Sequence, residues 1–335
     1  MKLKMAIFQS DEFIKTNFSQ LNDILDISND KGELTELNTE AYSHIDIICI
    51  DQMILSSKIL SKLKNLKLVA LRCTGSDHID IKTCKRLGIK ICNAPGYAAN
   101  SVAEHTFALI LGICRKMENA QQFTRNTIFS WEGLQGMEIQ GKTLGIIGTG
   151  AIGKRTAKIA SGFDMEVIAN DLFPDQKWAQ LTNVTYCELN NLLSKADIIT
   201  LCIPAIPQEK HQYLLAEEQF NQMKKGVIII NTARGELIEN KALLKALDQG
   251  IVSSAGLDVL PLEHYMRQKD KDLSIYFKTD IDSDEILTNY MLCQHPNVKI
   301  TPHTGWFSKE ADQKALDITI NNIRAFANND PQNML

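Results

Sequence analysis

The sequence predicts an α/β protein with two doubly wound parallel sheets, because short apolar runs alternate with helical stretches along the chain. In the first hundred residues this alternation already forms one α/β unit. A glycine-rich turn at residues 144–153 begins a second unit, and strand and helix patterns alternate again after it. A chain of 335 residues is long enough to build two domains with sizeable cores.

The composition is globular and narrows the classes of function. Hydrophobic residues make up 44% and charged residues 23%, and the net charge of −4 gives no reason to expect nucleic acid or an anionic membrane as partner. Without a long apolar stretch or a signal-peptide pattern, we expect a cytoplasmic protein that does not enter a membrane. The eight cysteines form no C-x-x-C pair, so we expect buried free thiols and no metal site.

Four apolar runs in the first hundred residues predict strands, and the stretches between them predict helices. The strands are expected at residues 4–8, 45–50, 66–72 and 89–92, and the helices at 13–25, 56–63 and 79–87. A loop broken by Pro95 and Gly96 then leads into a long apolar helix. Ser101 and Glu104 have capping-box spacing, so this helix is expected to begin at Ser101 and to be buried or at a subunit contact.

The glycine-rich turn has the spacing G-x-G-x-x-G, between a buried strand at 143–147 and a helix at 151–163. Gly148 permits a tight turn, Gly150 lets the backbone approach a pyrophosphate, and Gly153 lets the helix lie close on the strand. The free N–H groups at the helix N-terminus favour a phosphate. The same spacing also occurs in turns without a ligand, but the flanking strand and helix favour a bound dinucleotide.

The next strand, 167–170, ends at Asp171, where a carboxylate can accept hydrogen bonds from an adenosine ribose. A negative charge at this position repels a 2′-phosphate, so the sequence predicts NAD rather than NADP as the cofactor. The alternative is that Asp171 is only a solvated turn residue.

After Asp171 the alternation of strands and helices continues. Helices are expected at residues 189–195, 243–247 and 308–327, and strands at 198–203, 252–257 and 298–301. Another buried strand begins at Val227 and is expected to run into Arg234. Prolines 204 and 207 end the strand at 198–203, and Ser308 is the expected N-cap of the closing helix. Residues 261–296 form a long polar segment to which no element is assigned.

Arg234, Glu263 and His303 each follow a buried strand, and ligands bind outside the carboxyl ends of strands in open α/β sheets. Hydride transfer to a ketone needs an acid for the developing alkoxide, which a histidine can supply near neutral pH. A neighbouring carboxylate orients the histidine, and an arginine holds a substrate carboxylate through its planar fork. Each residue alone is as readily an ordinary polar group, but beside a dinucleotide turn the three predict a catalytic site.

Five segments, in order, resemble the NAD-dependent D-isomer-specific 2-hydroxyacid dehydrogenases over about residues 66–326. They are residues 74–80, 97–109, 145–153, 231–235 with 256–258 and Glu263, and 301–303. The resemblance implies that Arg234 binds the substrate carboxylate and polarises its carbonyl, that His303 is the acid/base, and that Glu263 pairs with it. Leu260-Pro261-Leu262 and the long segment before His303 depart from the family pattern, so Glu285 is kept as the alternative partner.

The resemblance also implies the remaining contacts. Thr74 and Gly75 look like donors to the substrate carboxylate, and Tyr97 matches an aromatic pocket position. Trp306 is expected to line the pocket opposite Tyr97, with packing as core the equal alternative. Asp258 looks like the contact to the nicotinamide carboxamide. The full set of expected cofactor contacts is Gly148, Gly150, Ala151, Ile152, Gly153, Asp171, Ile203, Pro204, Thr232, Ala233, Arg234, Asp258 and His303.

By the same resemblance, residues 1–100 with 302–335 form the substrate domain and residues 101–301 the NAD domain. These domains are expected to be Rossmann-like or flavodoxin-like, with an active-site cleft between them. A homodimer through the helix after Ser101 is implied as well.

The expected function is NADH-linked reduction of a small 2-oxo acid, above all pyruvate to D-lactate, with hydroxypyruvate reductase as the alternative. A different class is a dinucleotide-sensing corepressor, which keeps the catalytic residues and has a tryptophan where Trp306 stands. The absence of a basic patch disfavours that class.

Overall fold

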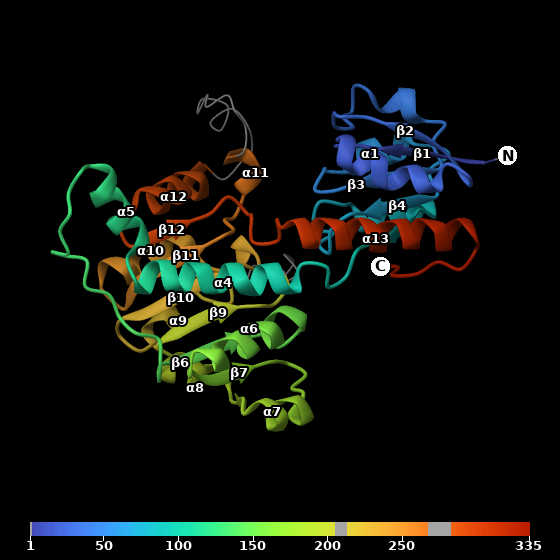
Figure 1. Cartoon of the computed structure of the whole chain (residues 1–335). Helices are drawn as coiled ribbons and strands as arrows, with labels where there is room; N and C mark the ends of the chain where they lie inside the picture. The colour runs from blue at the N-terminus through green and yellow to red at the C-terminus, as the bar shows by residue number, and fades with distance from the viewer. Residues whose placement is uncertain (1, 205–212, 267–282) are drawn as a thin grey trace. The chain divides into compact units, whose positions relative to one another are not determined.

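The computed structural model describes residues 2–204, 213–266 and 283–335 (Figure 1). The chain divides into two compact units, Met1–Ala98 with Phe307–Leu335 and Ala99–Trp306. Each unit is built on one parallel sheet, so the predicted α/β fold with two parallel sheets is confirmed. The chain passes from one unit to the other after Ala98 and after Trp306, whereas the boundaries expected from the sequence were 100/101 and 301/302. The roles expected for the two domains, and a cleft between them, stay predictions.

The first unit contains a five-stranded sheet. In sheet order its strands are β2 (Leu25–Asn29), β1 (Leu3–Ile7), β3 (Ile47–Ile50), β4 (Leu68–Leu71) and β5 (Lys90–Cys92). Its helices are α1 (Glu12–Phe18), α2 (Ser57–Lys62), α3 (Ile81–Leu87) and α13 (Lys309–Ala327), with 3-10 turns η1 (Ser19–Leu21) and η2 (Thr39–Tyr42). Helix α13 comes from the end of the sequence and packs Leu316, Ile320 and Ile323 into the core of this sheet. Its predicted N-cap is confirmed, because the Ser308 hydroxyl accepts the Ala311 N–H at 3.2 Å.

One expectation for this unit was wrong. The helix predicted over 13–25 ends at Phe18, and Leu25–Asn29 is the strand β2. This strand lies at the sheet edge and pairs only with β1 among the described strands. Only Leu25 is buried in it, so its apolar pattern is too short to distinguish a strand from the end of a helix.

The second unit contains a seven-stranded parallel sheet whose strand order reverses at β6 (Figure 1). In sheet order the strands are β12 (Val298–Ile300), β11 (Val252–Leu257), β10 (Val227–Asn231), β9 (Ile198–Leu201), β6 (Thr143–Ile147), β7 (Glu166–Asn170) and β8 (Thr185–Tyr186). The helices are α4 (Ala99–Cys114), α5 (Met117–Arg125), α6 (Ala151–Gly162), α7 (Gln176–Thr182), α8 (Leu189–Lys195), α9 (Glu217–Asn221), α10 (Asn240–Asp248), α11 (Glu263–Met266) and α12 (Ser283–Gln294), with the 3-10 turn η4 (Gly235–Leu237).

Apolar cores on two sides of this sheet make it doubly wound. One core joins the strands to α8, α9, α10 and α12, and the other joins them to α4, α6 and α7. A ligand site is expected where the strand order reverses, which is the carboxyl end of β6 between β9 and β7.

Several expectations for this unit were wrong in detail. Helix α4 begins at Ala99, so Ser101 lies inside its first turn and is not the N-cap. Strand β10 ends at Asn231, three residues before Arg234. The polar segment 261–296 contains α11 and α12, while its residues 267–282 lie outside the described residues, as does Pro207. The cysteines are free thiols, but Cys187 and Cys202 are only half-buried and Cys293 is exposed.

Candidate active site

The glycine turn after β6 forms an open cradle at the N-terminus of α6. Gly148 has a φ of +95°, which favours glycine. A Cβ at Gly153 would lie 2.0 Å from the carbonyl oxygen of Gly148, so helix and turn approach too closely for a side chain. A Cβ at Gly150, the N-cap of α6, would meet no atom within 4 Å. This open space beside the N–H groups of Ala151 and Ile152 fits the pyrophosphate of a dinucleotide.

Asp171 follows β7 and accepts several hydrogen bonds from the protein. Its Oδ2 accepts the Thr149 N–H at 2.6 Å and the Thr149 hydroxyl at 2.9 Å, and its Oδ1 accepts the Phe173 N–H at 2.8 Å. Burial raises the pKa of the Asp171 carboxyl, but these donors and the nearby charge of Lys154 outweigh it, and the pKa stays below its usual value. The carboxylate is therefore held ionised at the end of β7, where an adenosine ribose is expected.

The other expected cofactor residues follow β9 and β10. Ile203 packs on the glycine turn, since a Cβ at Gly148 would lie 2.5 Å from its side chain, and Pro204 is exposed beside it. After β10, the Thr232 and Thr106 hydroxyls lie 2.9 Å apart, and the Ala233 N–H donates to the Asn231 Oδ1 at 3.0 Å. These contacts fix the turn that leads to Arg234.

The imidazole of His303 lies against the carboxylate of Glu263. His303 Nδ1 is 2.5 Å from Glu263 Oε1, and both side chains are about three-quarters buried, with exposures of 22% and 26%. Since a carboxylate only accepts, Nδ1 carries a hydrogen and Nε2 is the nitrogen left for a substrate. Glu263 is the first residue of α11, and its Oε2 accepts the Leu260 N–H at 3.3 Å. The structure therefore brings Glu263 to His303, while the alternative, Glu285, lies on α12.

Two buried amides hold the segment before Glu263. Asn289 of α12 donates to the Pro261 carbonyl at 2.7 Å, and Asn240 of α10 donates to the Asn289 side-chain oxygen at 2.8 Å. Leu260 belongs to the core beneath them, which accounts for the apolar run before the glutamate. The segment just before α11 is thus held by the core at Leu260 and by a buried hydrogen bond at Pro261.

The turn that carries Arg234 packs against the same segment. A Cβ at Gly235 would lie 2.1 Å from the Leu260 carbonyl carbon and 2.2 Å from the Pro261 nitrogen, so only glycine fits there. The Arg234 carbonyl accepts from Asn231 at 2.8 Å, and its Nη1 donates to the Ala233 carbonyl at 2.8 Å. The turns bearing Arg234 and Glu263 therefore lie backbone against backbone.

Asp258 fixes the turn that carries His303. The carboxylate is 2% exposed and accepts from the Thr301 hydroxyl at 2.6 Å, the Thr304 N–H at 2.9 Å and the Gly305 N–H at 2.8 Å. The main-chain carbonyl of Asp258 accepts the His303 N–H at 2.8 Å. Burial raises the pKa of this carboxyl, but the surrounding donors hold it below its usual value. A contact from Asp258 to a nicotinamide carboxamide stays a prediction, since both carboxylate oxygens already serve this turn.

Thr74, Gly75 and Tyr97 belong to the first unit, whereas the other expected site residues belong to the second. After β4, the Thr74 hydroxyl donates to the Ala94 carbonyl at 2.7 Å and the Asn93 side chain donates to the Thr74 carbonyl at 2.7 Å. Thr74 and Gly75 thus lie in a turn held at the carboxyl end of the first sheet. Their contacts with substrate, and those of Tyr97 and Trp306, stay predictions.

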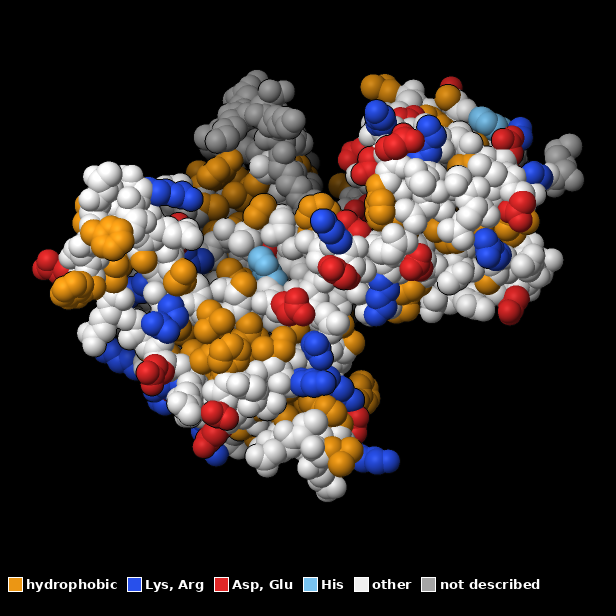
Figure 2. Space-filling view, in the orientation of Figure 1, with side chains coloured by type: hydrophobic (Ala, Val, Ile, Leu, Met, Phe, Trp, Pro, Cys, Tyr) orange, Lys and Arg blue, Asp and Glu red, His pale blue; other side chains and the backbone are white. Residues whose placement is uncertain are grey.

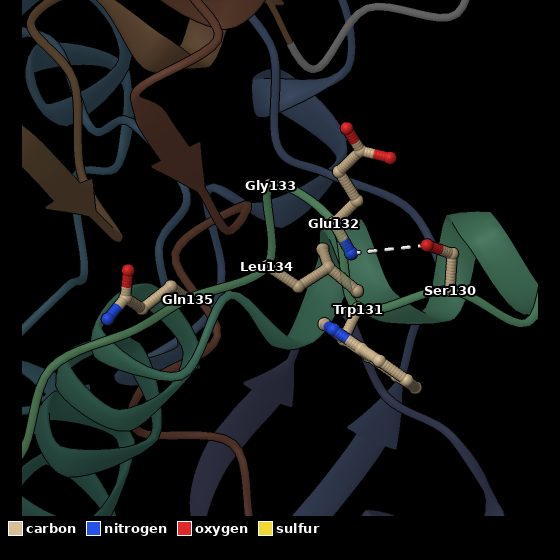
Figure 3. A pocket seen from close by; sticks show the side chains of 6 residues that line it. All are labelled: Ser130, Trp131, Glu132, Gly133, Leu134 and Gln135. Atoms are coloured by element: carbon tan, nitrogen blue, oxygen red, sulfur yellow. Dashed lines mark hydrogen bonds between the residues drawn. The ribbon is translucent and has the colours of Figure 1, made fainter.

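A surface hollow lined by residues 130–135 contains none of the expected site residues (Figure 3). Its lining is nearly all exposed, and the Glu132 N–H donates to the Ser130 hydroxyl at 3.2 Å. The chain from the start of α5 to this hollow has exposed apolar side chains at Met117, Ile128, Phe129 and Trp131. Figure 2 shows exposed hydrophobic side chains at the left edge of the molecule, where Figure 1 places α5. We assign no ligand to this hollow.

Two polar side chains near the expected site residues were not predicted from the sequence. His105 of α4 lies 2.9 Å from the Thr301 hydroxyl and 3.3 Å from Asp258 Oδ1. Tyr186 of β8 lies 2.6 Å from the Thr149 hydroxyl. These contacts join positions far apart in the sequence, so periodicity and motif spacing give no signal for them. In the described residues there is no group of His, Cys, Asp and Glu suited to a metal ion, and no helix is long and apolar enough to cross a membrane.

A protein-family model described as D-isomer specific 2-hydroxyacid dehydrogenase, NAD binding domain, matches residues 107–305. A 2-hydroxyacid dehydrogenase homolog of Haemophilus influenzae is 37% identical, covering 87% of this chain and 85% of that protein. D-lactate dehydrogenase of Escherichia coli is 33% identical, covering 96% of both chains. An aromatic 2-oxoacid reductase of Clostridium sporogenes is 36% identical over 80% of this chain and 78% of its own.

Two solved structures bear on the ligands. D-lactate dehydrogenase from Aquifex aeolicus, complexed with NAD and lactic acid, matches with a TM-score of 0.85 at 28% identity, over 97% of this chain and 96% of that one. An acyclic imino acid reductase in complex with NADPH and D-Arg matches with a TM-score of 0.82 at 27% identity, over 99% and 100% of the chains. One of these two structures therefore holds NAD, and the other holds NADPH.

Proposed function

Because this chain belongs to the D-isomer specific 2-hydroxyacid dehydrogenase family, we propose that it reduces a small 2-oxo acid with NADH, above all pyruvate to D-lactate. The observation that carries the catalytic part is the 2.5 Å contact between His303 Nδ1 and Glu263, beside the turn of Arg234. The likeness to D-lactate dehydrogenases over nearly the whole chain supports pyruvate as the substrate.

The glycine turn, the N-terminus of α6 and Asp171 would hold the cofactor, which supplies a hydride to the carbonyl carbon when bound. His303 enters protonated and donates its Nε2 proton to the developing alkoxide. Glu263 faces Nδ1, so it stabilises the imidazolium and keeps Nε2 turned outward. After the proton transfer, His303 is a neutral imidazole that retains its Nδ1 hydrogen.

Arg234 orients the substrate in this proposal. Its guanidinium offers parallel N–H donors that match the two oxygens of a carboxylate, and its charge polarises the adjacent carbonyl. The backbone packing of Gly235 on Leu260 and Pro261 fixes the position of the turn from which the Arg234 side chain extends. Thr74 and Gly75 would complete the grip on the carboxylate from the first unit.

The direct test is a screen of NADH oxidation with pyruvate, hydroxypyruvate, 2-oxobutyrate, phenylpyruvate and 2-oxoisocaproate. We expect the highest kcat/KM with pyruvate. A preference for hydroxypyruvate would identify a glycerate-type reductase. Dinucleotide binding without turnover of any of the five would instead favour the corepressor-like class.

Replacing Glu263 with Gln should slow pyruvate reduction. The carboxylate holds the His303 ring by its Nδ1 hydrogen and stabilises the positive charge of the imidazolium that donates the proton, and a neutral amide does so less well. Single-turnover reduction of pyruvate by both proteins measures the change. An unchanged rate would move the role to another acid, with Glu285→Gln as the next variant.

NADH should be strongly preferred to NADPH, because the ionised Asp171 repels a 2′-phosphate. Replacing Asp171 with Asn should bring the kcat/KM for NADH and the kcat/KM for NADPH closer together, mainly through changes in KM for the two cofactors. Comparable values in the wild-type protein would contradict the assignment.

Replacing Trp306 with Ala should shift kcat/KM from pyruvate toward phenylpyruvate, if Trp306 and Tyr97 limit the space for the substrate side chain. Discrimination between the two substrates should change by about 1–3 kcal/mol, as for other apolar pocket contacts. If Trp306 is only core, all substrates fall together and Tm drops. A wild-type preference for phenylpyruvate would contradict the small pocket.

A homodimer through α4 and a cytoplasmic location belong to the proposal as well. Helix α4 buries Ala103, Thr106 and Ile110 within its own unit, and the exposed apolar side chains near α5 lie just beyond it. Sedimentation of the purified chain would establish the number of subunits.

A further inference from the structure

An ion pair lies beside the glycine turn and takes no part in the proposed reaction. Lys154 of α6 places its Nζ 2.6 Å from Asp175 Oδ2 and 5.3 Å from the centre of the Trp178 ring. Asp175 is also the N-cap of α7, because its Oδ1 accepts the Trp178 N–H at 3.0 Å. The ammonium group is therefore held toward the start of α7.

The same pair is joined to the carboxylate that is expected to bind the adenosine ribose. The Tyr186 hydroxyl accepts the Asp175 N–H at 3.2 Å and lies 2.6 Å from the Thr149 hydroxyl. Since the Thr149 hydroxyl gives its hydrogen to Asp171, Tyr186 is the donor to Thr149. The charge of Lys154 is also close enough to help lower the pKa of Asp171, though less than the hydrogen bonds do. Lys154 is thus a cation next to the expected ribose, held by a second acid.

We propose that Asp175 is a second residue that determines cofactor specificity, because by pairing with Lys154 it withholds an ammonium group from the 2′-phosphate of NADPH. The inference rests on the proposed function, which sets the adenosine ribose at Asp171. Asp171 disfavours the phosphate by repulsion, whereas Asp175 removes a cation that would bind it. Replacing Asp171 alone would therefore leave NADPH without a positive partner.

The test compares NADH and NADPH in the variant Asp175→Asn. Asparagine is as good an N-cap as aspartate, so α7 keeps its start while the charge that holds Lys154 is lost. We expect kcat/KM for NADPH, relative to NADH, to rise about two- to fivefold, as for loss of one partly exposed ion pair. The change should lie in KM and not in kcat. Inhibition by 2′,5′-ADP should strengthen by the same factor relative to 5′-ADP.

The gain must depend on Lys154. In the double variant Asp175→Asn/Lys154→Met the NADPH preference should return to the wild-type level. A gain that survives in the double variant overturns the proposal, since simple loss of repulsion or the neighbouring Lys177 would then be responsible. Absence of any gain in Asp175→Asn overturns it as well, because Lys154 would then not reach the phosphate. Glu217→Gln is the matched control, because it breaks a surface pair with Lys245 of the same 2.6 Å length, on α9 and α10.

The variant Asp171→Asn distinguishes a failure of the inference on Asp175 from a failure of the proposed cofactor site. If Asp171→Asn narrows the cofactor ratio while Asp175→Asn does not, only the present inference fails. If neither variant changes the ratio, the ribose does not lie at Asp171, and the proposed cofactor site fails with it.

Discussion

His303→Gln is expected to reduce pyruvate about 10²- to 10⁴-fold more slowly than the wild-type protein, while still binding NADH. Glutamine keeps a polar side chain of similar reach but has no proton to release to an alkoxide. The contact with Glu263 would become an ordinary hydrogen bond, with no charge to stabilise. Single-turnover reduction of pyruvate measures the step, and quenching of protein fluorescence by NADH measures binding.

A backbone effect must be separated from this chemical one. His303 has a φ of +54°, in the left-handed region that asparagine adopts more readily than glutamine. His303→Asn is therefore the matched control, and it should be as inactive as His303→Gln with a Tm closer to that of the wild type. A variant of either kind that retains most of the activity would show that another group is the acid.

Arg234→Lys is expected to lose about a hundredfold in kcat/KM, although it keeps the positive charge. A lysine cannot present two parallel N–H donors to a carboxylate, so the carbonyl is left poorly aligned with its acid. The loss should appear in both KM and kcat, because one contact binds the substrate and orients it.

The matched control for this change is Arg324→Lys on α13, an exposed arginine of the first unit. It should leave both constants unchanged. If Arg234→Lys remained within about twofold of wild type, the carboxylate would not be held by a bidentate clamp at Arg234.

Some buried strands and regular helices could be predicted from the sequence nearly to the residue. Strand β11 and helix α8 begin and end where their apolar patterns do, because burial on both faces or along one stripe leaves a clear signal. Strand β2 and helix α12 could not be predicted in this way. The first is a polar edge strand, and the second has no marked difference between its faces, since Thr288 and Asn289 are buried polar residues.

In the candidate site, too, some residues could be predicted from the sequence and others could not. Residues just after strands, such as Arg234 and His303, could be placed because parallel strands bring their carboxyl ends to one edge. The side chains that support the site could not, because their contacts join positions far apart in the sequence: Asn289 to Pro261, Tyr186 to Thr149 and Asp175 to Lys154. Fixing such partners requires the packed structure, in which each buried donor has a definite acceptor.

The left-handed backbone at His303 also bears on how such a chain can change by mutation. The fold restricts this position to residues that tolerate a positive φ, and the proposed reaction restricts it to an acid, so few side chains satisfy both demands. Asparagine satisfies the first alone, and its codons differ from those of histidine by one base. A single mutation can therefore abolish turnover while sparing the turn and the glycine cradle. The fold thus offers a short route from a catalyst to a protein that only senses its dinucleotide.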